Sequence, residues 1–101
     1  MSTDKKSDIG IKDRQKFKKP SKYKVIFNND DYTPMIFVEI LLQHIFHKGA
    51  EEASAITLSV HKTGRGIAGV YSKEIADTKT NLANELAKAN GHPLLITNEK
   101  E

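Results

Sequence analysis

The segment Asn28–Met35, with the sequence NNDDYTPM, crowds two carboxamides, two carboxylates and a threonine hydroxyl into one short connection. Asn and Asp favour turns, because their side chains bond to the nearby backbone. Turn chemistry does not explain two adjacent acids in a chain of formal net charge +3, followed so closely by the apolar Met35. Carboxylate and amide oxygens accept strong charge-assisted hydrogen bonds from an amine. The segment predicts a site for a ligand that carries an amine beside an apolar group, with a turn and helix cap as the alternative.

Other chemistries have weaker support in the residue pattern. The loop lacks the alternating ligands, the glycine and the terminal glutamate of a calcium-binding EF-hand. His44 and His47 share one side of a helix but supply only two ligands, too few for a zinc site, so we interpret them as surface residues. The chain has no cysteine, and no Ser-His-Asp arrangement of known spacing occurs. We therefore expect no metal, no cofactor and no enzymatic activity.

Hydrophobic periodicity predicts the elements that position this segment. A strand is expected over residues 22–28, and a helix over 34–47 with Thr33 as N-cap, Pro34 as first residue and Gly49 at its end. The remaining elements are expected, in order, as a helix over about 50–61, a strand over 67–71, a helix that begins at the N-cap Ser72 and stops at Asn90-Gly91, and a strand over 93–97.

Apolar stripes on the three helices predict which faces are buried. They comprise Val38, Leu41, Leu42 and Ile45 on the first helix, Ala53, Ile56, Thr57 and Val60 on the second, and Ile75, Leu82, Ala83, Leu86 and Ala87 on the third. The order β-α-α-β-α-β favours an α+β fold, a small two-layer sandwich with the helices on one face of a sheet.

Length and charge predict two parts in the chain. Its 101 residues suffice for one domain. Residues 1–22 carry eight Lys or Arg against three Asp, whereas residues 23–101 carry eight basic against ten acidic residues. We therefore expect a flexible, basic N-terminal arm over 1–21 and a folded domain over 22–101. Such an arm can bind nucleic acid or an acidic surface, but it fits a solubilising, disordered arm better. No membrane-spanning run or secretory signal is visible, so a soluble intracellular protein is expected.

The run Asn29–Met35, followed by Phe37-Val38 and later by Val60-His61, closely resembles the ClpS adaptor family. The resemblance extends from about Tyr23 to about Glu99. It implies a three-stranded antiparallel sheet with three helices, like the C-terminal domain of the ribosomal stalk protein. It also implies a non-enzymatic adaptor that binds N-degrons, proteins whose N-terminal residue is bulky and hydrophobic (Leu, Phe, Tyr or Trp), and delivers them to a Clp ATPase.

The resemblance also assigns roles to individual residues. It implies that the ligand's amino group is bound at Asn29, Asp30, Asp31 and His61, with Asp30 also shaping the rim. The implied hydrophobic pocket consists of Thr33, Met35, Val38, Thr57, Val60 and Leu94, and the implied docking surface for the ATPase consists of Tyr71, Glu74 and Lys79. The implied partner is the N-terminal domain of a ClpA- or ClpC-type ATPase, whose pore engages the N-terminal arm. A monomer in the bacterial cytoplasm is expected, with plastids as the alternative.

Thr57 departs from the family pattern, which usually has methionine four residues before the histidine. Threonine is shorter, β-branched and polar, so we expect a wider pocket that excludes Ile and Val less strongly. Two further hypotheses stay open at this level. One is a different peptide- or protein-binding module whose basic tail binds an acidic partner, and the weaker one is a small hydrolase that uses Asp30, Asp31 and His61.

Overall fold

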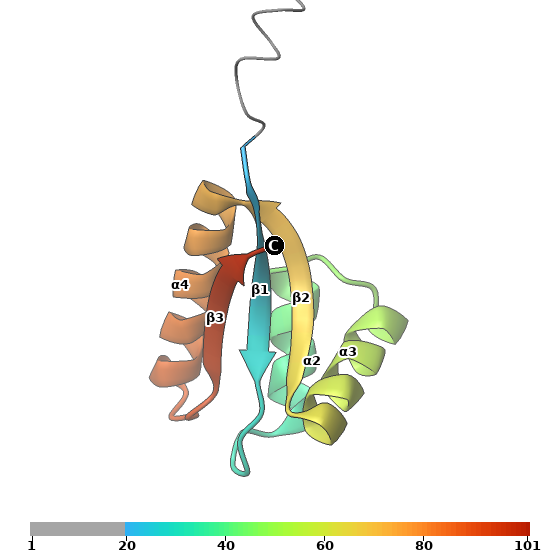
Figure 1. Ribbon diagram of the computed structural model, residues 1–101. Helices are drawn as coiled ribbons and strands as arrows, with labels where there is room; N and C mark the ends of the chain where they lie inside the picture. Colours follow the sequence, from blue (N-terminus) through green and yellow to red (C-terminus); the bar gives the residue numbers. More distant parts are fainter. Residues whose placement is uncertain (1–19) are drawn as a thin grey trace, which may run out of the picture.

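The computed structural model describes residues 20–101, which form the predicted order β-α-α-β-α-β. The strands are β1 (Lys22–Asn28), β2 (Arg65–Ser72) and β3 (Leu95–Lys100), and the helices are α2 (Met35–His44), α3 (Ala50–Thr63) and α4 (Lys73–Ala89). Of the basic arm expected over 1–21, all but the last two residues lie outside the described part of the chain. Figure 1 shows a three-stranded sheet backed by the helices, so the predicted α+β sandwich is confirmed.

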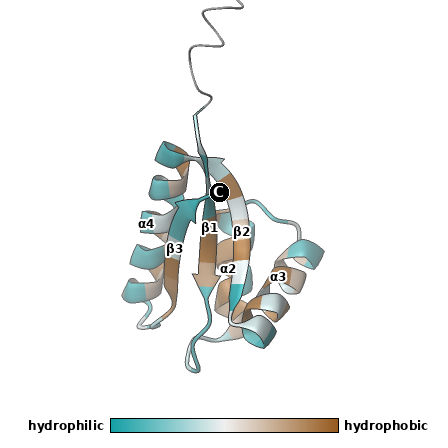
Figure 2. Ribbon diagram, viewed as in Figure 1, coloured by the Kyte–Doolittle hydropathy of each residue, from teal (hydrophilic) through white to brown (hydrophobic). Residues whose placement is uncertain are grey.

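β1 is the central strand and pairs antiparallel with both neighbours, in the order β2-β1-β3. Because side chains alternate along a strand, Val25 and Phe27 face the helices, where they are completely buried. The β1–β2 register shifts between Val25 and Ile26, at a β-bulge in which Ala68 is the extra residue of β2. Figure 2 shows hydrophobic colours along the middle of β1 and β2, and hydrophilic colours in the loop that follows β1.

The core confirms the predicted stripes of the first two helices and corrects that of the third. In α4 the buried residues are the small ones, Ala76, Thr80, Ala83 and Ala87. Ile75, Leu82 and Leu86 were also expected inside, but they are 48%, 44% and 38% exposed. The small side chains let α4 approach the sheet closely, which turns its larger apolar residues toward solvent.

The ends of α2 differ from the sequence-based prediction. Pro34, not Thr33, is the N-cap, with an extended backbone and a carbonyl that accepts a 3.0 Å bond from the N–H of Phe37. The helix ends at His44 with Ile45 as its C-cap, rather than near Gly49, and His47 in the following connection takes a left-handed conformation with φ of 57°. Histidine is among the residues enriched in that conformation. Gly49 serves instead as the extended N-cap of α3.

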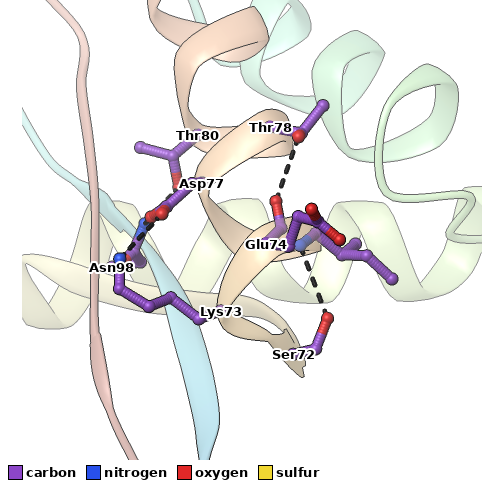
Figure 3. A network of polar contacts seen from close by, with 8 residues as sticks. Ser72, Lys73, Glu74, Asp77, Thr78, Thr80 and Asn98 are labelled. Carbon is purple, nitrogen blue, oxygen red and sulfur yellow. Dashed lines mark hydrogen bonds and ion pairs between the residues drawn. The ribbon is translucent and has the colours of Figure 1, made fainter.

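The start of α4 follows the predicted capping chemistry. The Ser72 hydroxyl accepts a bond from the N–H of Ile75 at 3.4 Å, as an N-cap does (Figure 3). Asn98 of β3 donates from its amide to Asp77 at 3.1 Å and to the Thr80 hydroxyl at 3.0 Å, which ties α4 to the edge of the sheet. β3 extends to Lys100, beyond the predicted end at residue 97, because its last, polar residues still pair with β1.

Candidate functional site

Three connections meet at one end of the domain, at the bottom of Figure 1. They are the loop between β1 and α2, the turn from α3 into β2, and the segment that leads from α4 into β3. The backbone N–H of Asn29 donates to the carbonyl of Gly64 at 2.9 Å, which joins the loop to the turn. Gly64 has φ of 92°, a left-handed conformation that glycine adopts without a steric penalty, and it closes α3. This bond holds the acidic loop beside the C-terminal turn of α3.

A pocket with a volume of about 160 Å³ lies where these connections meet. Ten residues line it, and they are the ten to which the family resemblance assigned amine binding or the hydrophobic pocket: Asn29, Asp30, Asp31, Thr33, Met35, Val38, Thr57, Val60, His61 and Leu94. The structure thus brings all ten together. What they do toward a ligand stays a prediction.

The pocket has a buried inner wall and an exposed rim. Val38, Thr57, Val60 and Leu94 form the inner wall and are each at most 5% exposed, whereas Met35 at the rim is 42% exposed. An apolar cavity of about 150 Å³ in another protein accommodates benzene. The pocket is therefore of the size that an aromatic or leucine side chain requires.

A close approach between α3 and β2 places the inner wall. A β-carbon at Gly66 of β2 would lie 2.5 Å from Cγ2 of Val60, so only glycine lets α3 pack at this distance. Val60 then sits against the sheet and Thr57 lies one turn earlier on the same side of the helix. Gly66 thus allows the close packing of α3 on β2 that places Val60 and Thr57 on the inner wall of the pocket.

Asp30 organises the loop. Its carboxylate accepts three bonds of 2.7 Å, from the backbone N–H groups of Tyr32 and Thr33 and from the Thr33 hydroxyl. Burial raises the pKa of the Asp30 carboxyl, but these bonds, with a smaller contribution from the charge of His92, outweigh it and hold the pKa below 3.8. The Thr33 hydroxyl, expected to cap the helix, bonds to Asp30 instead. Asp30 therefore shapes the loop, and its free lone pairs are the part that a ligand can use.

Acid is expected to loosen this loop only at unusually low pH. Because folding depresses the Asp30 pKa, its stabilisation is complete above the unfolded value and is lost as the pH falls through the lower folded value. An NMR titration of the Tyr32 and Thr33 amide resonances should show a midpoint below 3.8. The variant Asp30→Asn should lack the transition, and a midpoint at or above 3.8 in the unmodified protein would contradict the expectation.

Three acceptors at the rim are available for a ligand. Asn29, Asp31 and His61 are exposed, and within residues 20–101 their side chains have no hydrogen-bond or ion-pair partner. A carboxylate, an amide oxygen and a neutral imidazole nitrogen all accept bonds from an ammonium group. The rim can therefore hold an amine while its apolar substituent enters the pocket.

His92 is a neighbour of the site that the local sequence does not mark. Its ring packs on Phe37, with ring centroids 4.5 Å apart, and its charge acts on Asp30. Nothing in the local pattern around Pro93 marks this position, because the contact joins the start of α2 to the α4–β3 connection. His92 therefore adjoins the start of α2 and the acidic loop.

The three residues assigned to ATPase docking lie near one another but have different surroundings. Glu74 and Lys79 line a hollow of about 480 Å³ between α2 and α4, with His44 and His47 on its other side. Glu74 is exposed, and burial raises the pKa of the Tyr71 phenol. The ammonium of Lys79 lies 5.3 Å from the centroid of the Tyr71 ring. A shared surface around this hollow is thus present, and its docking role stays a prediction.

Lys79 also has a structural role, since its ammonium donates to the carbonyl of Ile45 at 2.6 Å. That carbonyl belongs to the C-cap of α2, where helices leave carbonyls unpaired and favour positive charge. Replacing Lys79 with methionine should lower the free energy of unfolding by about 1–2 kcal/mol, because a partly buried carbonyl loses its donor. Chemical denaturation measures this loss. The matched variant Lys88→Met, on the exposed face of α4, should change stability by less than about 0.5 kcal/mol. Equal stability of the two variants would contradict the capping role.

A hollow of about 360 Å³, lined by residues of the three strands and by Ser59 of α3, is larger than the pocket but chemically less suited to a ligand. Its charged side chains pair with one another, since Lys24 and Arg65 both approach Glu99, at 3.7 and 3.2 Å. No cluster of three or more His, Cys, Asp or Glu residues within 20–101 could hold a metal ion. Within the same range, no helix is long and apolar enough to span a membrane.

Comparisons with known proteins agree with this architecture. A family model described as ATP-dependent Clp protease adaptor protein ClpS matches residues 18–97. The ClpS adapter protein of Shewanella halifaxensis is 51% identical over 84 residues, which cover 83% of this chain and 82% of that protein. The corresponding protein of Clostridium acetobutylicum is 50% identical over 97 residues, which cover 96% of each.

A solved structure adds a comparison of the fold. The structure of Agrobacterium tumefaciens ClpS2 bound to L-phenylalaninamide has a TM-score of 0.80 and 36% sequence identity, and the match covers 82% of this chain and all of that one. The fold and the pocket define a small α+β domain with a partly apolar pocket at one end. The chain belongs to the ClpS family of Clp protease adaptors.

Proposed function

We propose that this protein is a non-enzymatic adaptor that binds proteins with a bulky hydrophobic N-terminal residue and delivers them to a Clp ATPase for degradation. The observation that carries the proposal is the pocket itself, which combines a buried, largely apolar inner wall with rim acceptors that have no partner among residues 20–101. This combination suits an α-amine with an apolar side chain. A free α-amine and a phenyl group are also the features of the phenylalaninamide held by the structural relative.

The proposed roles divide between rim and wall. Asn29, Asp31 and His61 receive the ammonium group, and Asp30 holds the loop in the conformation that presents them. These contacts select a chain terminus over an internal residue, because only the terminus has an α-amine. The inner wall then buries the first side chain, which contributes roughly 1.5–3 kcal/mol for a Leu- or Phe-sized group.

Delivery requires a second surface. We propose that the N-terminal domain of a ClpA- or ClpC-type ATPase docks around Tyr71, Glu74 and Lys79, and that the N-terminal arm is engaged by its pore. The exposed carboxylate of Glu74 is the charged group of this surface that is available to a partner, because Lys79 bonds to Ile45. We further propose that the adaptor acts as a monomer in the cytoplasm of a bacterium, since the relatives named above are bacterial.

A binding measurement tests the proposed function directly. Fluorescent peptides that begin with Phe or Leu are titrated into the full-length protein, together with N-acetylated twins of the same sequence. The free-amine peptides should bind and the acetylated twins should not, because acetylation removes the charge and the donors that the rim accepts. Equal binding of both forms would favour a general peptide-binding module, and no binding of either form would reject the proposal.

Thr57 is expected to relax the exclusion of β-branched side chains. It stands where relatives usually have methionine, and it is 2% exposed on the inner wall. The ratio of dissociation constants for Val- and Leu-initiated peptides should rise by about tenfold in the variant Thr57→Met, since a methylene-sized change in a pocket has an effect of this order. Isothermal titration with Leu, Ile and Val peptides measures the ratios. If the unmodified protein already excludes Ile and Val as strongly as the variant does, the expectation is wrong.

A further inference from the structure

The hydroxyl of Thr57 is a buried polar group without a partner. The Thr57 residue is 2% exposed, and its Oγ1 atom has no hydrogen-bond partner within the part of the chain that the structure describes. Buried hydroxyls are usually paired, so an unpaired one calls for a specific explanation. It is the one unpaired buried side-chain atom of this kind among residues 20–101, and it belongs to a residue of the pocket.

Other threonines in the helices behave differently. Helical threonines commonly donate to the carbonyl four residues earlier. The Thr63 hydroxyl donates to the carbonyl of Ser59 at 2.7 Å, and that of Thr78 donates to the carbonyl of Glu74 at 3.0 Å (Figure 3). Thr57 lies inside α3 and has an equivalent carbonyl at Ala53, yet it does not form this bond. The side chain is therefore held in an orientation that leaves its hydroxyl free.

We propose that the Thr57 hydroxyl is a specificity determinant that favours tyrosine over phenylalanine as the first residue of the ligand. This inference rests on the proposed function. A phenol that enters an apolar pocket loses its bonds to water, and tyrosine hydroxyls generally find a partner when they are buried. The hydroxyl of Thr57 supplies both a donor and an acceptor. A tyrosine ligand thus pairs two hydroxyls that otherwise stay unpaired, whereas a phenylalanine ligand leaves that of Thr57 without a partner.

The placement of the two polar groups along α3 suits this ligand. His61, at the rim, and Thr57, on the inner wall, are four residues apart on the same side of the helix. Four residues span about 6 Å along a helix axis. A tyrosine has a comparable distance between its α-carbon and its hydroxyl. A ligand whose amine is bound at the rim near His61 therefore extends its side chain in the direction of Thr57.

The test measures coupling between the two hydroxyls. Dissociation constants of matched Tyr- and Phe-initiated peptides are determined for the full-length protein and for Thr57→Val, which replaces the hydroxyl by a methyl group of similar shape. The preference for Tyr over Phe should fall by about 3- to 10-fold in Thr57→Val, the range for one neutral hydrogen bond. Thr57→Ser keeps the hydroxyl and should retain most of the preference. The control Thr78→Val removes a hydroxyl outside the pocket and should leave the preference unchanged.

The outcomes separate this inference from the proposed function. An identical ratio of Tyr to Phe affinity in the unmodified protein and in Thr57→Val overturns the inference, even if both peptides bind through their free amines. Loss of selectivity for the free amine overturns the proposed function as well. If Thr57→Val unfolds, as circular dichroism would reveal, the comparison of Thr57→Ser with the unmodified protein decides. Equal affinities of Thr57→Ser for the Tyr- and Phe-initiated peptides would then count against a role of the hydroxyl.

Discussion

Replacing Asp31 with alanine is expected to weaken the binding of a Phe-initiated peptide by about 10- to 100-fold. Asp31 is exposed at the rim, and its carboxylate has no partner in the described part of the chain, so a bound ammonium group is free to pair with it. Hydrogen bonds to charged groups contribute more than neutral ones, which sets the size of the effect. The melting temperature should stay unchanged, because no described contact of the folded domain is lost.

The design of this experiment separates binding from folding. Fluorescence anisotropy measures the dissociation constants of the free-amine peptide, and thermal denaturation follows each variant. Glu85→Ala is the matched control, because Glu85 is an exposed carboxylate on α4, an element that contributes no residue to the pocket. The control should bind within twofold of the unmodified protein. An equally small change in Asp31→Ala would exclude Asp31 from amine binding.

Replacing Phe27 with alanine is expected to lower the free energy of unfolding by about 3–5 kcal/mol. Phe27 is completely buried in the central strand, and its ring contacts that of Phe46 edge to face, with centroids 5.4 Å apart. A small domain is stabilised by only about 5–15 kcal/mol in total, so this loss is a large fraction of its stability. Removing the ring leaves a cavity in the core beside Phe46.

Urea denaturation with a matched surface variant measures this loss. Tyr32→Ala removes an aromatic ring that is 81% exposed, so it should change stability by less than about 0.5 kcal/mol. A loss below about 1 kcal/mol in Phe27→Ala would mean that the core collapses around the missing ring.

Local chemistry accounts for the parts of the fold that the sequence predicted well. Ser72 caps α4 and Asn90-Gly91 ends it, because capping depends on residues that are neighbours in the chain. The prediction was wrong at the end of α2, where His47 rather than a glycine takes the left-handed position. The predicted buried face of α4 was also wrong. Apolar residues occur on several sides of this helix, so periodicity alone does not identify the side that is buried. Contact with the sheet selects it, and the close fit favours alanine.

The acidic loop shows the same contrast between what local residue types predict and what the packing of the chain decides. The residue types of the loop were sufficient to predict an acceptor-rich connection. They did not show that the two acids of the loop have different structural roles. Asp30 binds the backbone of its own loop, whereas Asp31 stays unpaired among the described residues. Adjacent carboxylates look alike in a sequence. The direction in which each one points depends on how the chain turns toward Pro34 and α2.

By itself the sequence determined the order of the elements, both caps of α4 and the kinds of groups in the loop, because these depend on neighbours within a few residues. Local residue chemistry did not show which distant residues share the pocket; the family resemblance implied them, and the tertiary structure brings them together. It places His61 and Leu94 beside the loop, directs Lys79 to the end of α2 and leaves the Thr57 hydroxyl without a partner in the described part of the chain. The physical reason is that such contacts join separate elements, so they depend on how the helices pack on the sheet and not on local periodicity.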